Sequence, residues 1–290
     1  MAISANGNGN GSSNGNGRVG ALVDTEWVEA HRNDPEVRLI EVDVNTHAYT
    51  EGHIPNAVGW DWRKDLQQRP ARDIPSKAEW EALLQRSGVS NDTHVLLYGD
   101  NNNWFAAFAY WVFKLYGHER VSLIDGGRVK WAAEGRELTT DAPQIAPAAY
   151  RATELNRSLR AHRDHVERAV YQRDHHLIDV RSPGEFSGEL LAPENLPQEG
   201  AQRGGHIPSA HNIPWATAVA ADGAFKPVEE LRAIYANGGP DTPAITYCRI
   251  GERSAHTWFV LTELLGHTNV RNYDGSWTEW GSLIGAPIER

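Results

Sequence analysis

The chain has 290 residues, of which 40% are hydrophobic and 23% are charged, and its formal net charge is −10. This length and composition are typical of a globular protein with two domains. The acidic charge and the lack of a long basic run argue against general binding to nucleic acids or anionic membranes, and a single cysteine excludes an intramolecular disulfide.

The first 18 residues are rich in Gly, Asn and Ser. Such a segment cannot bury enough apolar surface to fold, so we expect a disordered tail. It lacks the basic and then apolar layout of a signal peptide. No apolar run is long enough to span a bilayer. Together these features predict a cytoplasmic protein.

Residues 19–138 alternate predicted strands and helices. Short apolar runs such as "RLIEVD" at residues 38–43 indicate buried strands. In "PSKAEWEALLQRSG", Ser76 and Glu79 have the spacing of a capping box, and Gly88 is placed to end the helix. The strand "VLLY", a helix over 104–116 closed by Gly117, and the strand "RVSLID" follow.

A second copy of this pattern occupies residues 151–290, after a Pro/Ala-rich linker at 139–150. "LIDV" repeats "LIEV", "GHIP" occurs in both copies, and the two align without a gap from Tyr98 to Trp131. The helix in "KPVEELRAIYANGG" is expected to begin with Pro227 at its first position and to end at Gly238. A helix over 254–265 closed by Gly266 and the strand "NVRNYD" complete the copy.

Alternation of strands and helices predicts an α/β fold, with a parallel sheet flanked by helices in each copy. The second copy is longer by an insertion at about 183–203. Its Pro and Gly content predicts a surface loop, which could serve as a lid.

The cysteine, Cys248, begins the segment "CRIGERS" directly after the strand "AITY". In a parallel sheet, a turn at this end of a strand presents backbone N–H groups and the positive end of the next helix. Gly251 lets the backbone bend, and Arg249 and Arg253 add positive charge. We therefore expect a depressed thiol pKa and a nucleophilic cysteine, rather than a buried hydrophobic one.

The first copy provides an internal comparison. It has Gly99, Asp100 and Trp104 where the second has Cys248, Arg249 and Arg253. Without the nucleophile and the cations it cannot carry out the same chemistry. We expect it to be a structural domain that forms one wall of the active site.

Taken together, the paired "LIEVD"/"LIDVR" and "GHIP" segments, "YCRIGERS" and "NYDGSWTEW" resemble a tandem-domain rhodanese, a thiosulfate sulfurtransferase. The loop is especially similar to that of actinobacterial-type members. The resemblance covers nearly the whole chain after the tail. It implies a non-catalytic rhodanese-like domain at 19–138 and a catalytic one at 151–290.

The resemblance also implies a mechanism. The thiolate attacks the outer sulfur of thiosulfate, sulfite leaves, and a thiophilic acceptor such as cyanide removes the sulfur from the persulfide. Cys248 is then the nucleophile, and the loop amides cradle the persulfide (residues Ile250, Gly251, Glu252 and Ser254, with Arg249 and Arg253). Three arginines bind the anionic donor: Arg181, Arg249 and Arg253. Asp179 contacts these binding residues and not the donor itself. No metal or organic cofactor is implied.

Two features depart from the family pattern. Ile250 stands where some members have a second consecutive cation, and Glu252 adds a negative charge, expected at the rim, that would weaken anion binding. Arg249 disfavours 3-mercaptopyruvate as the donor, because enzymes that use it have small residues there. A protein acceptor for the persulfide stays open.

A phosphatase is the main enzymatic alternative. Its loop needs an arginine six residues after the cysteine, whereas that position here is Ser254. A sulfur-binding module that hands persulfide to a partner is the alternative that is not a free-standing enzyme.

Other candidates are weaker. His53 and His206 recur in both "GHIP" segments and are interpreted as structural, and the histidines in "DHH" at 174–176 lack partners at ligand spacing. The turn "GDNNNW" is the vestigial counterpart of the active loop, and Trp215 is a possible contact to the pocket.

Overall fold

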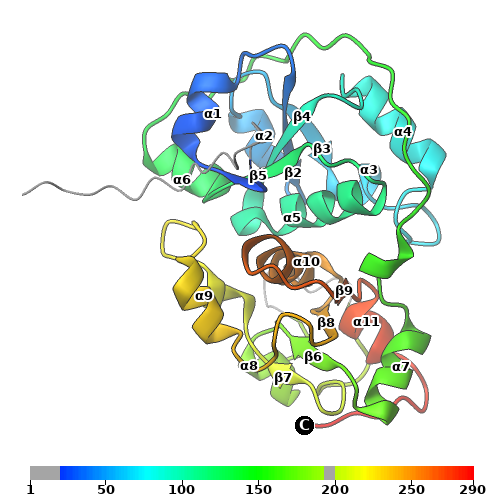
Figure 1. Cartoon of the computed structure of the whole chain (residues 1–290). Coiled ribbons are helices and arrows are strands. Elements are labelled where there is room, and N and C mark those ends of the chain that lie inside the picture. The colour runs from blue at the N-terminus through cyan, green and yellow to red at the C-terminus, as the bar shows by residue number, and fades with distance from the viewer. Residues whose placement is uncertain (1–19, 193–199) are drawn as a thin grey trace, which may run out of the picture.

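The computed structural model describes residues 20–192 and 200–290 and contains two parallel sheets, one in each half of the chain (Figure 1). The first sheet has the order β1-β5-β4-β2-β3. Its strands are β1 (Leu22–Val23), β2 (Val37–Asp43), β3 (Val58–Asp61), β4 (His94–Tyr98) and β5 (Val121–Ile124). The second has the order β7-β6-β8-β9. Its strands are β6 (His176–Asp179), β7 (His211–Asn212), β8 (Ala244–Tyr247) and β9 (Val270–Asn272). The predicted α/β class is confirmed.

Helices cover both sheets. In the first half they are α1 (Thr25–His31), α2 (His47–Glu51), α3 (Trp62–Asp65), α4 (Lys77–Arg86), α5 (Asp100–Leu115) and α6 (Gly127–Ala133). In the second half they are α7 (Arg163–Gln172), α8 (Pro183–Ser187), α9 (Val228–Ile234), α10 (Glu252–Phe259) and α11 (Ser276–Trp280). Among the described residues, no helix combines the length and apolar character needed to cross a bilayer.

Helix boundaries follow the sequence signals closely in some places and not in others. The capping box of Ser76 and Glu79 is present at α4, and Gly88 follows it at φ +69°. The helix expected to begin with Pro227 at its first position instead has that residue as its N-cap, and α9 ends at Ile234, before the predicted Gly238. A C-terminal glycine ends a helix only where the chain enters the left-handed region, and here the helix ends earlier.

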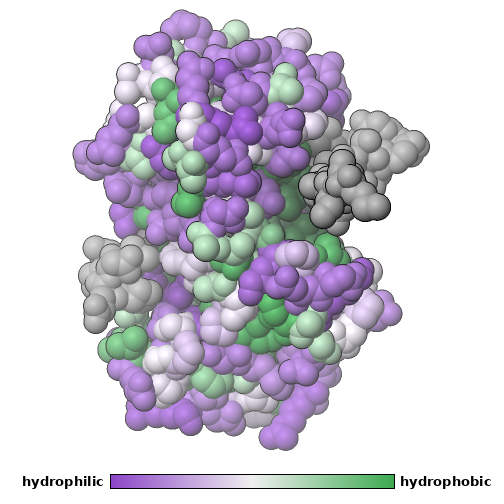
Figure 2. Space-filling view, turned by 90° about the vertical axis from the view of Figure 1, so that its left-hand side faces the viewer, coloured by the Kyte–Doolittle hydropathy of each residue, from purple (hydrophilic) through white to green (hydrophobic). Residues whose placement is uncertain are grey.

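The two halves meet through α5 and α10, which face each other in the middle of the molecule (Figure 1). Tyr110 of α5 packs edge-on against Phe259 of α10, with ring centroids 4.9 Å apart. The α5 segment "FAAFAYWVF" is apolar all round, because one face covers its own sheet and the other meets the second half. In Figure 2 hydrophobic side chains gather around the waist between the halves, whereas the upper half is mostly hydrophilic.

The repeated "GHIP" segments hold equivalent positions in the two halves. The backbone N–H of Ile54 donates to the Tyr98 hydroxyl (3.0 Å), and that of Ile207 donates to the Tyr247 hydroxyl (3.1 Å). Tyr98 ends β4, which precedes the loop at Gly99, and Tyr247 ends β8, which precedes the loop at Cys248. The motif therefore ties a neighbouring segment to the strand that carries the loop.

The histidine of each motif is structural, as predicted. His53 Nδ1 lies 3.0 Å from the carbonyl oxygen of Tyr49, and the two rings stack. His206 Nδ1 lies 2.9 Å from the carbonyl oxygen of Phe186, again with stacked rings. The same contacts occur in the half that lacks the cysteine, so they serve the fold and not the chemistry.

Candidate active site

Cys248 follows β8 directly, and α10 begins at Glu252, so the loop lies at the carboxyl edge of the second sheet. Gly251 has φ +102° and turns its N–H back toward the cysteine. This N–H donates to Cys248 Sγ at 3.2 Å. The sulfur therefore sits in a turn at the positive end of α10, as the sequence predicts.

The segment "NYDGSWTEW" forms the wall behind the loop. The N–H of Cys248 donates to Ser276 Oγ (3.0 Å), and the Trp277 N–H donates to the Cys248 carbonyl (3.0 Å). The Thr278 N–H donates to the Arg249 carbonyl (3.0 Å). Sequence analysis named this segment only as part of the family resemblance. Its role is to fix the backbone on both sides of the sulfur.

Ser254 and Asn272 fix the far end of the loop. The Ser254 hydroxyl is 2.6 Å from Asn272 Oδ1, and Asn272 Nδ2 donates to the carbonyl of Gly251 (3.2 Å). Both side chains are buried. The conformation of the glycine turn thus depends on a hydrogen-bonded pair that spans α10 and β9.

Arg253 does not project toward solvent. Its guanidinium makes two parallel hydrogen bonds with Glu185 of α8, at 2.9 and 3.0 Å, and lies over the Trp104 ring. Burial alone would raise the pKa of Glu185, but the hydrogen bonds and charge of Arg253 lower it to about 2. Glu185 thus takes hydrogen bonds from both terminal nitrogens of Arg253, whereas direct binding of the donor by Arg253 stays a prediction.

Arg181 is held by residues of its own half. Its side chain is fully buried, paired with Asp179 (Nη2 to Oδ2, 2.6 Å), and donates to the Gly205 carbonyl at 2.8 Å. It lies over the Trp277 ring, with 4.5 Å from its guanidinium carbon to the ring centroid. Arg181 and Asp179 together fasten the end of β6 to the "GHIP" segment and α11. Arg181 Nη1 is buried without a hydrogen-bond partner, and binding of an anionic donor by Arg181 stays a prediction.

Arg249 and Ile250 stay beside the cysteine. Both are buried, at 4% exposure each. Ile250 lines the cavity described below. Direct contact of Arg249 with a donor stays a prediction.

The thiol pKa differs from the prediction. Burial of Cys248 raises its pKa, and the nearby Glu252 carboxylate raises it further. Arg253 and hydrogen bonds from Ser254 act in the opposite direction but do not prevail. The sequence showed the cations and the helix end, but it did not show that the sulfur is completely withdrawn from water.

Glu252 was expected at the rim, and this is wrong. Its side chain is completely buried, and Cys248 Sγ donates to Glu252 Oε2 at 3.2 Å. The first residue of α10 therefore points inward to the sulfur.

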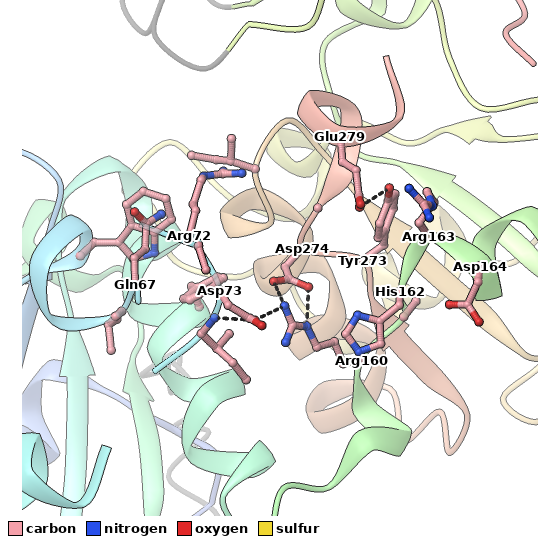
Figure 3. A pocket seen from close by; sticks show the side chains of 18 residues that line it. Gln67, Arg72, Asp73, Arg160, His162, Arg163, Asp164, Tyr273, Asp274 and Glu279 are labelled. Atoms are coloured by element: carbon pink, nitrogen blue, oxygen red, sulfur yellow. Dashed lines mark hydrogen bonds and ion pairs between the residues drawn. The ribbon is translucent and has the colours of Figure 1, made fainter. Parts of the chain in front are cut away.

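A cavity of about 610 Å³ opens between the two halves and reaches the active loop at Ile250 and the segment behind the loop at Gly275. The first half contributes Trp62, Asp73 and Phe108 to its lining. In Figure 3, Arg160 lies between Asp73 of the first half and Asp274 of the second, with ion pairs of 2.7 and 2.8 Å. The first domain thus forms one wall of the cavity beside the loop, as the sequence analysis expected.

The vestigial loop in the first half keeps the turn without the chemistry. Asn101, Asn102 and Asn103 all have left-handed backbones, and the Asp100 N–H donates to Asp43 Oδ1 (2.8 Å). The expected polar turn is thus part of α5 as the structure delimits it. Burial raises the pKa of Asp43 to about 8, and the neighbouring Glu41 and Asp100 add to this shift.

Because its folded pKa is raised, Asp43 favours the fold fully below its ordinary value of 3.8, and this contribution is lost as the pH rises toward 8. We expect Asp43→Asn to raise the free energy of unfolding by about 1–3 kcal/mol at pH 8 and by almost nothing near pH 4. Urea unfolding at both pH values measures the difference, with the exposed Asp92→Asn as control. An equal effect at both pH values would contradict the titration of Asp43.

The remaining candidates stay outside the site. His175 Nε2 lies 3.1 Å from His165 Nε2, so the "DHH" segment contacts α7, and His176 begins β6. No group of three or more potential metal ligands occurs within residues 20–192 and 200–290. Trp215 packs edge-on against Trp104 of the first half, with centroids 4.8 Å apart.

The insertion is only partly a loop. It begins with α8, whose capping box joins Ser182 and Glu185, and that helix delivers Glu185 to Arg253. Residues 193–199 lie outside the described residues, so the idea of a lid over Cys248 stays a prediction. Arg203 then donates to carbonyls near the C-terminus, including those of Gly281 and Ala286.

Sequence reasoning missed Glu185, Ser276 and Asn272. The "SPGE" capping box could have located the helix of Glu185, but it gives no sign of the partner. Ser276 lies in "NYDGSW", which aligns with the first copy without a gap. That alignment does not indicate a contact between Ser276 and Cys248.

The rhodanese-like domain model matches residues 24–134 and, again, residues 162–283. The chain belongs to the rhodanese family. This rhodanese is 57% identical, over 274 residues, to a protein of Saccharopolyspora erythraea provisionally named a thiosulfate sulfurtransferase, with 94% of this chain and 97% of the relative covered.

It is also 52% identical to the sulfur carrier protein TtuD of Thermus thermophilus, with 93% of this rhodanese and 96% of TtuD covered. Among solved structures, SseA from Escherichia coli, described as a 3-mercaptopyruvate sulfotransferase, superimposes with a TM-score of 0.76 at 27% identity, covering 89% of this chain and 99% of SseA. These matches make the rhodanese a sulfurtransferase, and they confirm the predicted family and enzyme class.

Proposed function

We propose that this rhodanese is a thiosulfate sulfurtransferase that carries sulfur as a persulfide on Cys248. The thiolate forms a bond to the outer sulfur of thiosulfate, the bond between the two sulfur atoms of thiosulfate breaks, and sulfite leaves with the electron pair. A thiophilic acceptor then attacks the outer persulfide sulfur and releases the thiolate; with cyanide the product is thiocyanate. Because the sulfur travels on the cysteine itself, the cycle uses no metal or organic cofactor.

The single observation that carries this proposal is the position of Cys248 Sγ against the Gly251 N–H, at the start of α10. Persulfide and departing sulfite are both anionic, and fixed N–H groups at a helix N-terminus stabilise such charge without reorganisation. Arg249 would contact the donor, and Arg253 supplies positive charge from its ion pair. Gly251, Ile250, Glu252 and Ser254 complete the loop around the sulfur.

The cavity supports an anionic donor in general terms. It carries the cationic side chains of Arg72, Arg160 and Arg163 beside several carboxylates. It extends to the loop at Ile250, two residues after Cys248. Its volume of about 610 Å³ exceeds what thiosulfate needs and leaves room for a larger acceptor.

Two other donors or acceptors fit the same chemistry. The likeness to SseA favours a test of 3-mercaptopyruvate, although Arg249 gives the loop a bulky cation after the cysteine. The likeness to TtuD favours a persulfide that is handed to a protein acceptor. A cytoplasmic location stays a prediction from the sequence.

The test is to mix the protein with thiosulfate and record its intact mass beside Cys248→Ser. We expect the wild type to gain one sulfur atom, the variant to gain none, and added cyanide to release that sulfur as thiocyanate. Because Ser occupies almost the same volume, unfolding curves should show that the variant is folded. A wild type that stays unloaded by thiosulfate but is loaded by 3-mercaptopyruvate would overturn the choice of donor. No loading by either would overturn the persulfide mechanism.

A further inference from the structure

Glu252 places a carboxylate against the reacting sulfur. Its side chain has no exposed surface, and its Oε2 accepts a hydrogen bond from the Cys248 thiol at 3.2 Å. The other oxygen, Oε1, lies 3.7 Å from Arg253 Nε and has no hydrogen-bond partner. A buried carboxylate in this position needs an explanation, because it opposes the negative charge that a nucleophilic cysteine has to develop.

The contact limits how protons can be distributed. A thiolate and a carboxylate 3.2 Å apart, both completely buried, repel strongly, so the state in which both are ionised is disfavoured. One proton must lie between the two groups. It is on sulfur when the carboxylate accepts the bond, and on oxygen when the thiolate accepts it.

The other charged groups around the pair do not supply a second proton acceptor. Arg253 is a cation held by Glu185 through two hydrogen bonds. Arg249 is a further cation of the loop, and Asp274, which packs against Gly251, is engaged by Arg160. The Ser254 hydroxyl is engaged by Asn272. Among these described neighbours, Glu252 is the one carboxylate in contact with the sulfur.

We propose that Glu252 is the catalytic base of this rhodanese: it takes the proton of the Cys248 thiol as the sulfur attacks, and it keeps that proton while the persulfide exists. This inference rests on the proposed function. In the loading step the S–H bond breaks, the proton passes to Glu252 Oε2, a sulfur–sulfur bond forms to the outer atom of thiosulfate, and sulfite leaves with its electron pair.

Charge is conserved within the loop during this step. Before it, the pair consists of a neutral thiol and a carboxylate; after it, the pair consists of a persulfide anion and a neutral carboxylic acid. The net charge of the buried cluster does not change, so no uncompensated charge has to be buried. The neutral acid can donate a hydrogen bond to the persulfide. When the acceptor removes the outer sulfur, the proton returns to the cysteine.

The proton transfer also resolves the conflict over the thiol pKa. Burial and Glu252 raise that pKa, which would leave little thiolate at neutral pH if the proton had to go to water. Transfer to an adjacent carboxylate makes the reactive form a tautomer of the resting pair. Its fraction is independent of pH as long as the pair holds one proton.

Replacing Glu252 by glutamine distinguishes transfer of the thiol proton to Glu252 from its transfer to water. Glutamine has the same shape and can donate a hydrogen bond to sulfur, but it cannot take the proton. Cys248 in Glu252→Gln then ionises to water, so its reactivity should rise about tenfold per pH unit until the thiol pKa is reached. Loss of the carboxylate charge also lowers that pKa, so the variant should catch up with the wild type, or pass it, at high pH.

The experiment measures the rate of Cys248 alkylation by iodoacetamide from pH 6 to 9, for wild type, Glu252→Gln and Glu252→Asp. Iodoacetamide is neutral and does not depend on the proposed donor. Over pH 6–8 we expect a change of less than about threefold for the wild type and about 100-fold for Glu252→Gln, with the wild type faster at pH 6. Glu252→Asp keeps a carboxylate and should keep the plateau at a lower rate.

A wild-type rate that rises about tenfold per unit, in parallel with Glu252→Gln, would overturn the assignment. If Glu252→Gln does not fold, the wild-type profile and that of Glu252→Asp still decide the question. Sulfur loading from thiosulfate, followed by intact mass in the same series, separates the two proposals. A plateau in alkylation without loaded sulfur supports the base and removes thiosulfate as the donor, whereas loading without a plateau does the reverse.

Discussion

Arg253→Met is expected to lower the free energy of unfolding by about 3–5 kcal/mol at pH 7, because it leaves the Glu185 carboxylate buried without its partner. The two side chains are 3% and 2% exposed and joined at 2.9 Å. Breaking a buried pair costs far more than the pair contributes as a whole, since the remaining charge has no water to return to. Urea unfolding of the full chain measures the loss.

The pH dependence has a definite sign. Arg253 holds the pKa of Glu185 at about 2, below its ordinary value of 4.5. Glu185 therefore stabilises the wild type above pH 4.5, and this contribution is lost as the pH falls through 2. In Arg253→Met burial is opposed by the weaker effects of the Ser182 N–H and the Arg181 charge, so the pKa of Glu185 rises, and the variant is penalised most at pH 7 and less near pH 4.

Two further variants make the measurement specific. Arg253→Met combined with Glu185→Gln should recover at least half of the loss, because Glu185 then leaves no buried charge without its partner; the part that is not recovered includes the lost contact of Arg253 with Glu252. Arg232→Met removes one partner of an exposed pair with Glu229, of which the side chains are 60% and 81% exposed. Its expected cost is below about 1 kcal/mol. Equal losses for Arg253→Met and Arg232→Met would show that burial does not control the pair.

The fold follows from features that the sequence displays locally. Apolar runs of four to six residues with acidic ends, a capping box at Ser76 and a repeated "GHIP" motif are short-range signals. The gap-free alignment from Tyr98 to Trp131 places Gly99 and Cys248 at the same point of two equal units. Parallel sheets have their ligands at the carboxyl ends of strands, so the place of the active loop could be predicted from the order of elements alone.

The contacts within the site could not be predicted in the same way. Arg181, Arg253 and Glu252 are visible in the sequence as charges, but whether a charge faces solvent depends on segments far along the chain. Glu185 reaches Arg253 across 68 residues, and Arg160 bridges the two halves. From the sequence alone, Arg181, Arg249 and Arg253 are expected to be open to an anion, and Glu252 is expected at the rim. The structure buries all four of these side chains.

The first half lacks the cysteine and still shares structural contacts with the second half. Both halves keep the bond from the "GHIP" isoleucine to a strand tyrosine, Tyr98 or Tyr247. These contacts hold the sheet and do not involve the loop side chains. The first half also contributes α5 to the central contact and Asp73 to the cavity. The first half thus contributes to the central contact and to the cavity without the cysteine and the cations of the second loop.

Gly251→Ala is expected to reduce the rate of sulfur loading by at least about 100-fold, because the N–H that faces Cys248 Sγ depends on the conformation of this one residue. Gly251 has φ +102°, a backbone angle that residues other than glycine rarely adopt. A Cβ atom here would stand 2.8 Å from the Asp274 Cα, and that backbone is fixed between β9 and α11. The loop must shift, and the 3.2 Å contact to the sulfur is lost.

Gly266→Ala is the matched control for this substitution. Gly266 also has a positive φ, of +74°, and a Cβ built there meets nothing within 4 Å. It therefore isolates the cost of the backbone conformation, about 1 kcal/mol, from the displacement of the loop. We expect Gly266→Ala to load sulfur at nearly the wild-type rate. Stopped-flow mixing with thiosulfate compares the two variants, and wild-type loading by Gly251→Ala would mean that the persulfide is stabilised by the cations and not by the glycine turn.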